Sequence, residues 1–159
     1  MLDIEFPTQK RREFMPSLNH SYICLEVIKQ LLDNKDFQPL PELTLDIENG
    51  LTPDVSVFSK KQVKPNFLRD VLKFQEMPLV AIEVISPTQH IQDVLEKATS
   101  LVKAGVKSVW TIEPYGRTIF VTTENGENII HDDIVETAGL KVDFSKIFKQ
   151  MDDSTSLGS

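Results

Sequence analysis

One acidic residue, Glu83, stands inside the aliphatic run from Val80 to Ile85. A carboxylate buried among such side chains costs several kcal/mol unless it is protonated, paired with a cation or bound to a metal. The segment 86–89, Ser-Pro-Thr-Gln, is typical of a helix start. Glu83 is therefore expected at the carboxyl end of a central strand, where sites form in open α/β sheets. Pairing with a lysine or arginine stays open, but this position favours a metal ligand.

Asp54 is the second candidate, because it follows Pro53 and opens another apolar run. On its own it could be a turn residue. Two carboxylates brought together repel each other, and a shared proton, Mg²⁺ or Mn²⁺ relieves the repulsion. A metal in that place polarises a phosphoryl oxygen and helps to generate hydroxide, which is the chemistry of phosphodiester hydrolysis. Glu42, at the start of a predicted strand, is either a further ligand or an exposed strand residue.

Lys97 is the third candidate, in the helix predicted after Glu83. At about 100° per residue it falls at the margin of the apolar stripe, beside Val94 and Leu101. The stripe consists of Ile91, Leu95, Ala98 and Val102. Lys97 is then the basic residue of this helix nearest the sheet. It either pairs with Asp93 on the surface or holds an ammonium over the metal site, where it orients water or neutralises phosphate charge.

The remaining reactive side chains have ordinary structural interpretations. The single cysteine, Cys24, lies in an apolar helical pattern and is expected to be a buried structural thiol. The histidines lack metal-ligand spacing, so capping or packing is expected of His20, His90 and His131. Lys60 and Lys61, on a predicted loop, either are solvated or contact a phosphate backbone.

The elements that must position these residues follow from periodicity and turn signals. The predicted helices cover residues 17–33, with an apolar stripe of Leu18, Tyr22, Leu25, Ile28 and Leu32, then 86–103 and 142–148. The predicted strands cover residues 42–48, 54–58, 78–85, 106–112, 118–122 and 128–131. Asn49-Gly50 predicts a hairpin turn, and Pro39 and Pro41 are expected only to stop the first helix. A strand–helix–strand crossover beside a hairpin indicates an α/β fold, specifically an α+β mixed sheet flanked by helices.

Length and charge limit the class of protein. The 159 residues suit a single domain, expected over 1–151 with a disordered tail at 152–159. With 17 Lys and Arg against 24 Asp and Glu, the net charge is −7, which argues against a large non-specific nucleic-acid surface. It leaves room for a small metal-dependent phosphate site. No apolar stretch approaches the roughly 18 residues of a membrane span, so a cytoplasmic protein is expected.

Four segments together resemble a known family: Pro53-Asp54, Ala81 to Thr88, Glu96-Lys97 and Ala104 to Trp110. They resemble the Uma family of putative restriction endonucleases, formerly a domain of unknown function, in the PD-(D/E)xK nuclease superfamily. The resemblance runs from about Ser17 to Thr123. It implies a restriction-endonuclease-like core, in which a mixed sheet is flanked by helices.

The resemblance also implies roles for individual residues. The acidic pair falls on Asp54 and Glu83, and the backbone carbonyl of Val84 becomes an extra metal ligand. The superfamily pattern has a lysine two residues after the glutamate, but that position is Ile85. In Uma-like sequences the lysine comes from the following helix, which here means Lys97.

Two functional hypotheses remain. The first is a Mg²⁺- or Mn²⁺-dependent endonuclease that hydrolyses DNA, with Asp54, Glu83 and Lys97 as catalytic residues. Further candidates for substrate contacts are Ser86, Thr88, Lys60 and Lys61. A homodimer would supply the two cuts that duplex cleavage needs. The second hypothesis is a catalytically silent nuclease-fold module that binds DNA or protein, which the acidic net charge favours.

Overall fold

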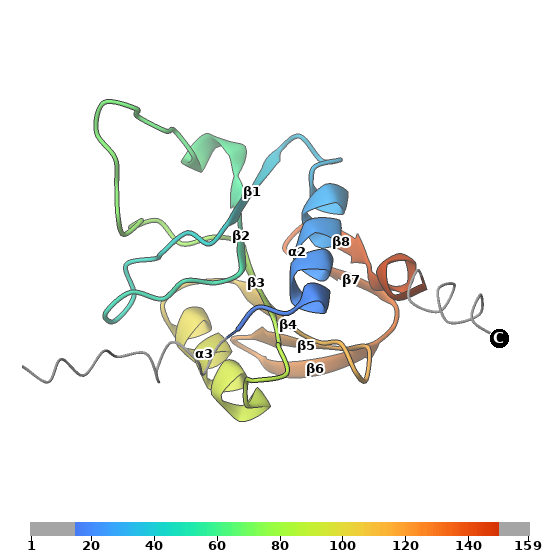
Figure 1. Cartoon of the computed structure of the whole chain (residues 1–159). Coiled ribbons are helices and arrows are strands. Elements are labelled where there is room, and N and C mark those ends of the chain that lie inside the picture. Colours follow the sequence, from blue (N-terminus) through green and yellow to red (C-terminus); the bar gives the residue numbers. More distant parts are fainter. Residues whose placement is uncertain (1–14, 150–159) are drawn as a thin grey trace, which may run out of the picture.

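A six-stranded mixed sheet forms the centre of the molecule (Figure 1). The computed structural model describes residues 15–149. In spatial order the strands are β1 (Phe37–Pro41), β2 (Val55–Ser59), β3 (Val80–Val84), β4 (Ser108–Glu113), β5 (Thr118–Thr123) and β6 (Gly126–His131). The predicted tail at 152–159 lies outside the described residues. The predicted single domain over 1–151 reaches beyond them at both ends and stays a prediction.

The predicted mixed sheet is confirmed. β3 and β4 pair in parallel, and α3 (Ile91–Lys103) makes the crossover between them. Every other neighbouring pair in the sheet is antiparallel. A parallel pair needs such a long connection, whereas the strands β4, β5 and β6 follow one another through short turns. The centre of the sheet is therefore the β3–β4 pair, and β3 is the strand that carries Glu83.

Helices cover both faces of this centre (Figure 1). α2 (Leu18–Leu31) packs on one face, together with the hairpin of β7 (Ile134–Thr137) and β8 (Leu140–Asp143). α3 packs on the other face against Ala81 and Val109. All five residues of β3 are buried, as expected of a strand covered on both sides. None of the helices within residues 15–149 has the length and apolar character that a membrane crossing requires.

The first helix was predicted correctly, but its buried face was not. α2 begins after Ser17, whose hydroxyl accepts a hydrogen bond from the His20 N–H at 3.2 Å. Its buried residues are His20, Ile23, Val27 and Leu31. The predicted stripe is wrong, since Leu18 and Leu25 are exposed. Both stripes have helical spacing, and the helix faces the sheet with the one that contains His20.

The predicted first strand of the hairpin is also wrong. The partner of β2 is β1, over 37–41, and residues 42–54 connect the two. Pro39 and Pro41 fit this strand because β1 lies at the edge of the sheet, where missing donors are tolerated. The alternation in 42–48 arises because the connection buries Leu45 and Ile47 against the α3 side of the core.

Two further boundaries differ from prediction. α3 begins at Ile91 and not at residue 86, because residues 87–89 form a turn. That turn is closed by the Ser86 N–H, which donates to Oε1 of Gln89 at 3.1 Å. The β7–β8 hairpin was not predicted, and the closing helix occupies residues 144–149 after it. The hairpin is tied to the sheet by Trp110 Nε1, which donates to Thr137 Oγ1 at 2.8 Å.

Candidate active site

The ends of β2 and β3 bring two carboxylates together. The last register pair of these antiparallel strands at this end is Val55 with Ile82, so the next positions along are Asp54 and Glu83. Oδ2 of Asp54 accepts a hydrogen bond from the Val84 N–H at 2.7 Å. Asp54 is thus fixed against the strand that carries Glu83, and the two predicted acidic residues are neighbours.

Glu83 is buried and paired with a lysine. It is 3% exposed, and its Oε1 lies 2.6 Å from Nζ of Lys97. The same ammonium donates to the carbonyl of Thr52 at 3.0 Å, so Lys97 is held between β3 and the segment before β2. The cation pairing that the sequence left open is therefore present, and it is supplied by α3. The predicted apolar stripe of this helix is partly wrong, since Ile91 is exposed and the buried residues are Val94, Ala98 and Leu101. Lys97 lies next to this buried face and reaches Glu83 from it.

Burial dominates the electrostatics of this pair. It raises the pKa of Glu83 from the ordinary 4.5 to about 8, although the Lys97 ammonium acts in the opposite direction. The neighbouring carboxylate of Asp54 raises the pKa further. Two carboxylates and one ammonium leave a net negative charge at the sheet edge when both acids are ionised. A divalent cation bound there would favour the ionised form of Glu83.

His20 is the neighbour that the sequence analysis missed. Its Nε2 lies 3.0 Å from Oδ2 of Asp54, and its side chain is buried. Cys24, one turn further along α2, lies beside it, and burial together with the charges of Asp54, Glu83 and Glu42 raises the pKa of this thiol to about 12. The helical spacing of His20 with Ile23, Val27 and Leu31 was the signal that could have placed it. The site is thus enclosed from both faces, by α2 and by α3.

The other predicted residues are distributed around this centre. Glu42 has an exposed side chain, and its N–H donates to the Asp54 carbonyl at 3.1 Å. Ser86 is buried, with Oγ at 3.3 Å from Oγ1 of the exposed Thr88.

The two predicted lysines lie elsewhere. Lys60 and Lys61 follow the opposite end of β2, in the short helix η1 (Lys60–Gln62), and are exposed. At about 3.3 Å per residue, the strand separates them from Asp54 by about 20 Å. The structure therefore does not bring them to the acidic pair.

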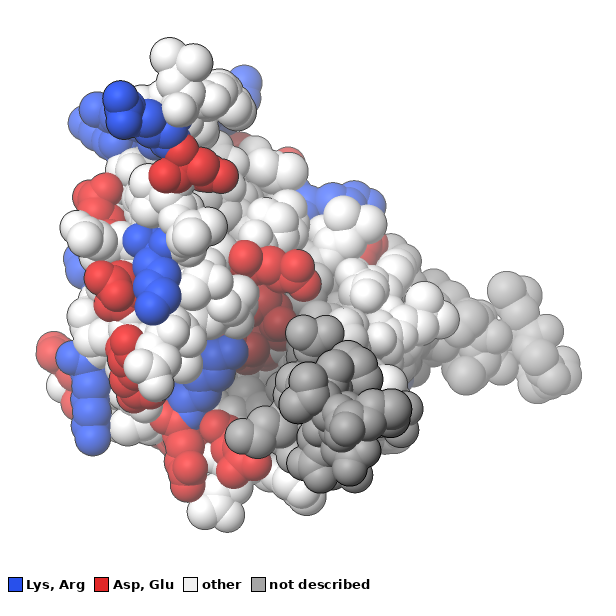
Figure 2. All heavy atoms as spheres, turned by 60° about the vertical axis from the view of Figure 1, so that its left-hand side comes forward, with Lys and Arg blue, Asp and Glu red and all other residues white. Residues whose placement is uncertain are grey.

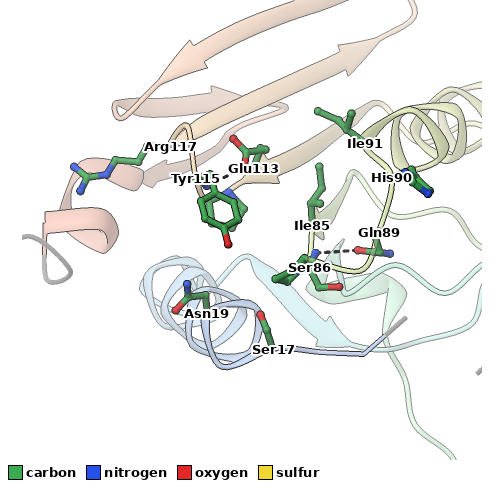
Figure 3. A pocket seen from close by; sticks show the side chains of 12 residues that line it. Ser17, Asn19, Ile85, Ser86, Gln89, His90, Ile91, Glu113, Tyr115 and Arg117 are labelled. Carbon is green, nitrogen blue, oxygen red and sulfur yellow. Dashed lines mark hydrogen bonds between the residues drawn. The ribbon is translucent and has the colours of Figure 1, made fainter. Parts of the chain in front are cut away.

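A pocket of about 640 Å³ opens beside the site, at the same edge of the sheet (Figure 3). Ser17 and Asn19, at the start of α2, face Ser86 and Tyr115 across it. The carboxylate of Glu113 fixes the β4–β5 turn, accepting hydrogen bonds from two backbone N–H groups of that turn. Ile85 and Ser86, just beyond the end of β3, line the pocket, whereas Asp54, Glu83 and Lys97 are not among its lining residues.

Charge on the visible surface is mixed (Figure 2). On that face, basic side chains are separated by acidic ones, and acidic side chains gather in and beside a hollow at its centre. No continuous basic surface is seen there. Affinity for a polyanion on this face would therefore depend on local groups more than on a broad field.

Comparison with protein families identifies the chain. The model of the Uma2 family, described as putative restriction endonuclease, matches residues 11–150. The chain belongs to the Uma2 family. The predicted resemblance is confirmed, and the family description supports a nuclease. A comparison with curated proteins gave no match.

A solved structure shares the fold of this Uma2 protein. A crystal structure of a putative nuclease belonging to DUF820 from Anabaena variabilis is 23% identical in sequence, with a TM-score of 0.73. The match covers 86% of this chain and 83% of the other. A chain of a DrdV–DNA complex, observed by cryoEM, is 12% identical, with a TM-score of 0.43 over 77% of this chain and 10% of that chain. The first match shows the same fold, whereas the second is too distant to carry an argument.

Proposed function

We propose that this Uma2 protein is a nuclease that hydrolyses DNA phosphodiester bonds with Mg²⁺ or Mn²⁺. The observation that carries the proposal is the meeting of Asp54, Glu83 and Lys97 at one sheet edge, with Glu83 buried and Lys97 at 2.6 Å from it. The family description supports the same class of activity. A cytoplasmic location is part of the same proposal.

The residues where β2 begins and β3 ends fit a divalent cation. Carboxylate oxygens are the donors that Mg²⁺ and Mn²⁺ prefer. Asp54 and Glu83 would hold the metal, with the Val84 carbonyl and Glu42 as further candidate ligands. Burial raises the pKa of Glu83 although Lys97 lowers it, which supports a further cation beside this carboxylate. When bound, the cation would polarise a phosphoryl oxygen and lower the pKa of a water molecule.

The protein groups have separate tasks in this proposal. The Val84 N–H and His20 orient the Asp54 carboxylate from two sides. The Thr52 carbonyl anchors the Lys97 ammonium. From there Lys97 can neutralise the charge that develops on the phosphoryl group, or orient the attacking water. Ser86 and Thr88, next to the pocket, and the distant Lys60 and Lys61 are proposed contacts for the rest of the DNA.

Cleavage of plasmid and linear duplex DNA tests the proposal. We expect cleavage with Mg²⁺ or Mn²⁺, none with EDTA, and loss of cleavage in Asp54→Asn and Glu83→Gln. Glu96→Gln is the matched control, because Glu96 is an exposed acid on α3. Equal cleavage by the wild type and both site variants, purified in the same way, would refute the assignment.

The alternative, a silent module that binds DNA or protein, is favoured by the net charge of −7 and by the mixed charge of Figure 2. Metal-dependent DNA binding without cleavage, on duplex and single-stranded substrates, would support it.

A homodimer belongs to the nuclease proposal, and light scattering of the protein with and without DNA tests it.

A further inference from the structure

A second group of metal-binding side chains lies on the α2 side of Asp54. His20 and Cys24 are four residues apart in α2, so they project from the same face of the helix. That face meets Asp54, and one potential ligand atom from each of the three residues lies within 4.8 Å of the others. Within residues 15–149, this is the one group of three His, Cys, Asp or Glu residues that meets this criterion.

We propose that His20, Cys24 and Asp54 form a binding site for a cation of the zinc class, separate from the Glu83 and Lys97 side of Asp54. An imidazole nitrogen, a thiolate sulfur and a carboxylate oxygen are the ligands typical of Zn²⁺ and Co²⁺, whereas Mg²⁺ takes oxygen ligands. The proposal does not depend on whether the protein cleaves DNA.

The distances fit such a centre with small movements. Bonds of about 2.0–2.3 Å in a tetrahedral zinc site place the ligand atoms roughly 3.3–3.8 Å apart. Nε2 of His20 and Oδ2 of Asp54 are 3.0 Å apart, and the thiol completes the group within 4.8 Å. Side-chain rotations that move the ligand atoms by a fraction of an ångström to about one ångström would therefore form the site.

The surroundings of Cys24 favour a cation. Asp54, Glu83 and Glu42 all act on this partly buried thiol with negative charge. When the cation binds, the S–H bond breaks, the proton passes to solvent, and Cys24 binds as thiolate. The charge of the cation then compensates both the thiolate and the Asp54 carboxylate.

Asp54 is shared between this site and the proposed nuclease metal. Its Oδ2 faces His20 and the Val84 N–H, and the carboxylate has a second oxygen available for the side of Glu83. A zinc-class cation would therefore compete for Asp54 with the divalent cation of the acidic pair.

Absorption spectroscopy with Co²⁺ tests the proposal on the full chain without a histidine tag. Because Cys24 is the single cysteine, a sulfur-to-cobalt charge-transfer band can arise only from it. We expect this band to saturate at one Co²⁺ per chain and to disappear in Cys24→Ser. His20→Gln and Asp54→Asn should weaken Co²⁺ binding roughly tenfold or more. Glu83→Gln and Lys97→Met should retain the band, which separates this site from the nuclease site.

The opposite results are equally definite. Absence of the band at saturating Co²⁺, or a band unchanged in both His20→Gln and Asp54→Asn, would overturn the proposal. Circular dichroism establishes that each variant is folded. As a second measurement, Zn²⁺ should raise the melting temperature of the wild type and not that of Cys24→Ser. Absence of DNA cleavage by the wild type with Mg²⁺ or Mn²⁺, together with a normal cobalt band, would refute the proposed function alone.

Discussion

Nζ of Lys97 lies 2.6 Å from Oε1 of Glu83, and the two residues come from α3 and β3, the elements on either side of the first crossover turn. Ala98 and Leu101, both fully buried, fix the rotation of α3 against the sheet. Ile85 occupies the position at which a lysine follows the glutamate in the wider nuclease pattern. Correct docking of α3 is therefore a condition for placing an ammonium beside Glu83.

Replacement of Lys97 by methionine tests its role. The variant keeps the apolar stem but loses the ammonium, so we predict that DNA cleavage falls by roughly 10²–10³-fold. Mn²⁺ binding, which depends on the carboxylates, should change much less. Lys103→Met is the matched control, because Lys103 is exposed at the end of the same helix. A full cleavage rate in Lys97→Met, measured at saturating metal, would remove Lys97 from the mechanism.

The raised pKa of Glu83 predicts a pH-dependent stability of the metal-free protein. Below about pH 4.5, Glu83 is protonated in both the folded and the unfolded chain. As the pH rises toward about 8, the unfolded chain releases this proton while the folded chain retains it, so the free energy of unfolding falls. Relative to Glu83→Gln, the wild type should lose on the order of a few kcal/mol over this window.

Urea denaturation of both proteins at several pH values, in the presence of EDTA, measures this difference. Comparison with Glu83→Gln cancels the other titrating groups. Addition of Mn²⁺ should stabilise the wild type more at pH 8 than at pH 5, because the cation favours ionised Glu83. Parallel curves for the two proteins across the whole range would show that Glu83 is not the group that titrates.

Much of this site was predictable because its residues conflict with their surroundings. An acid in an aliphatic strand and a lysine at the margin of an apolar stripe are visible in sequence, and Glu83 and Lys97 do meet. Asp54 was harder, since the predicted hairpin used the wrong first strand. The position of Asp54 nevertheless holds, because β2 was predicted correctly and its register against β3 decides where its first residues lie.

Capping or packing was expected of His20 because the histidines lack metal-ligand spacing. Two stripes of α2 have helical spacing, and spacing alone does not tell which one faces the sheet. That choice is made by tertiary packing, against β3 and the β7–β8 hairpin. β1 was missed for a related reason. Pro39 and Pro41 disfavour a central strand, and only the sheet order reveals that β1 is at the edge.

Calorimetry with Mn²⁺ separates the two carboxylates from their neighbours. We predict that Asp54→Asn and Glu83→Gln each weaken Mn²⁺ binding at least tenfold, roughly the loss seen when a metal site loses part of its support. Cys24→Ser should leave Mn²⁺ binding unchanged, because a thiol is a poor ligand for this cation. Unaltered Mn²⁺ binding in both carboxylate variants would show that the acidic pair does not hold the metal.

The attachment of the β7–β8 hairpin to the sheet depends on the Thr137 hydroxyl. It accepts the indole N–H of Trp110 at 2.8 Å and donates to Oγ of Ser108 at 3.0 Å. Thr137→Val keeps the shape but leaves two buried polar groups without this partner, so we predict a loss of about 1–3 kcal/mol in the free energy of unfolding. Trp110 is the single tryptophan, so its fluorescence reports both the unfolding transition and the lost hydrogen bond.

The matched control is Thr123→Val, because the Thr123 hydroxyl only accepts the Asn125 N–H in an exposed turn. Its effect should stay within about 0.5 kcal/mol. An equal urea midpoint for Thr137→Val and the wild type, with unchanged tryptophan emission, would contradict the proposed anchoring. The hairpin would then be held by the apolar contacts of Val135, Leu140 and Val142, which are buried in the same core as Trp110, and by the two hydrogen bonds between the Gln30 side chain and the Asp143 backbone.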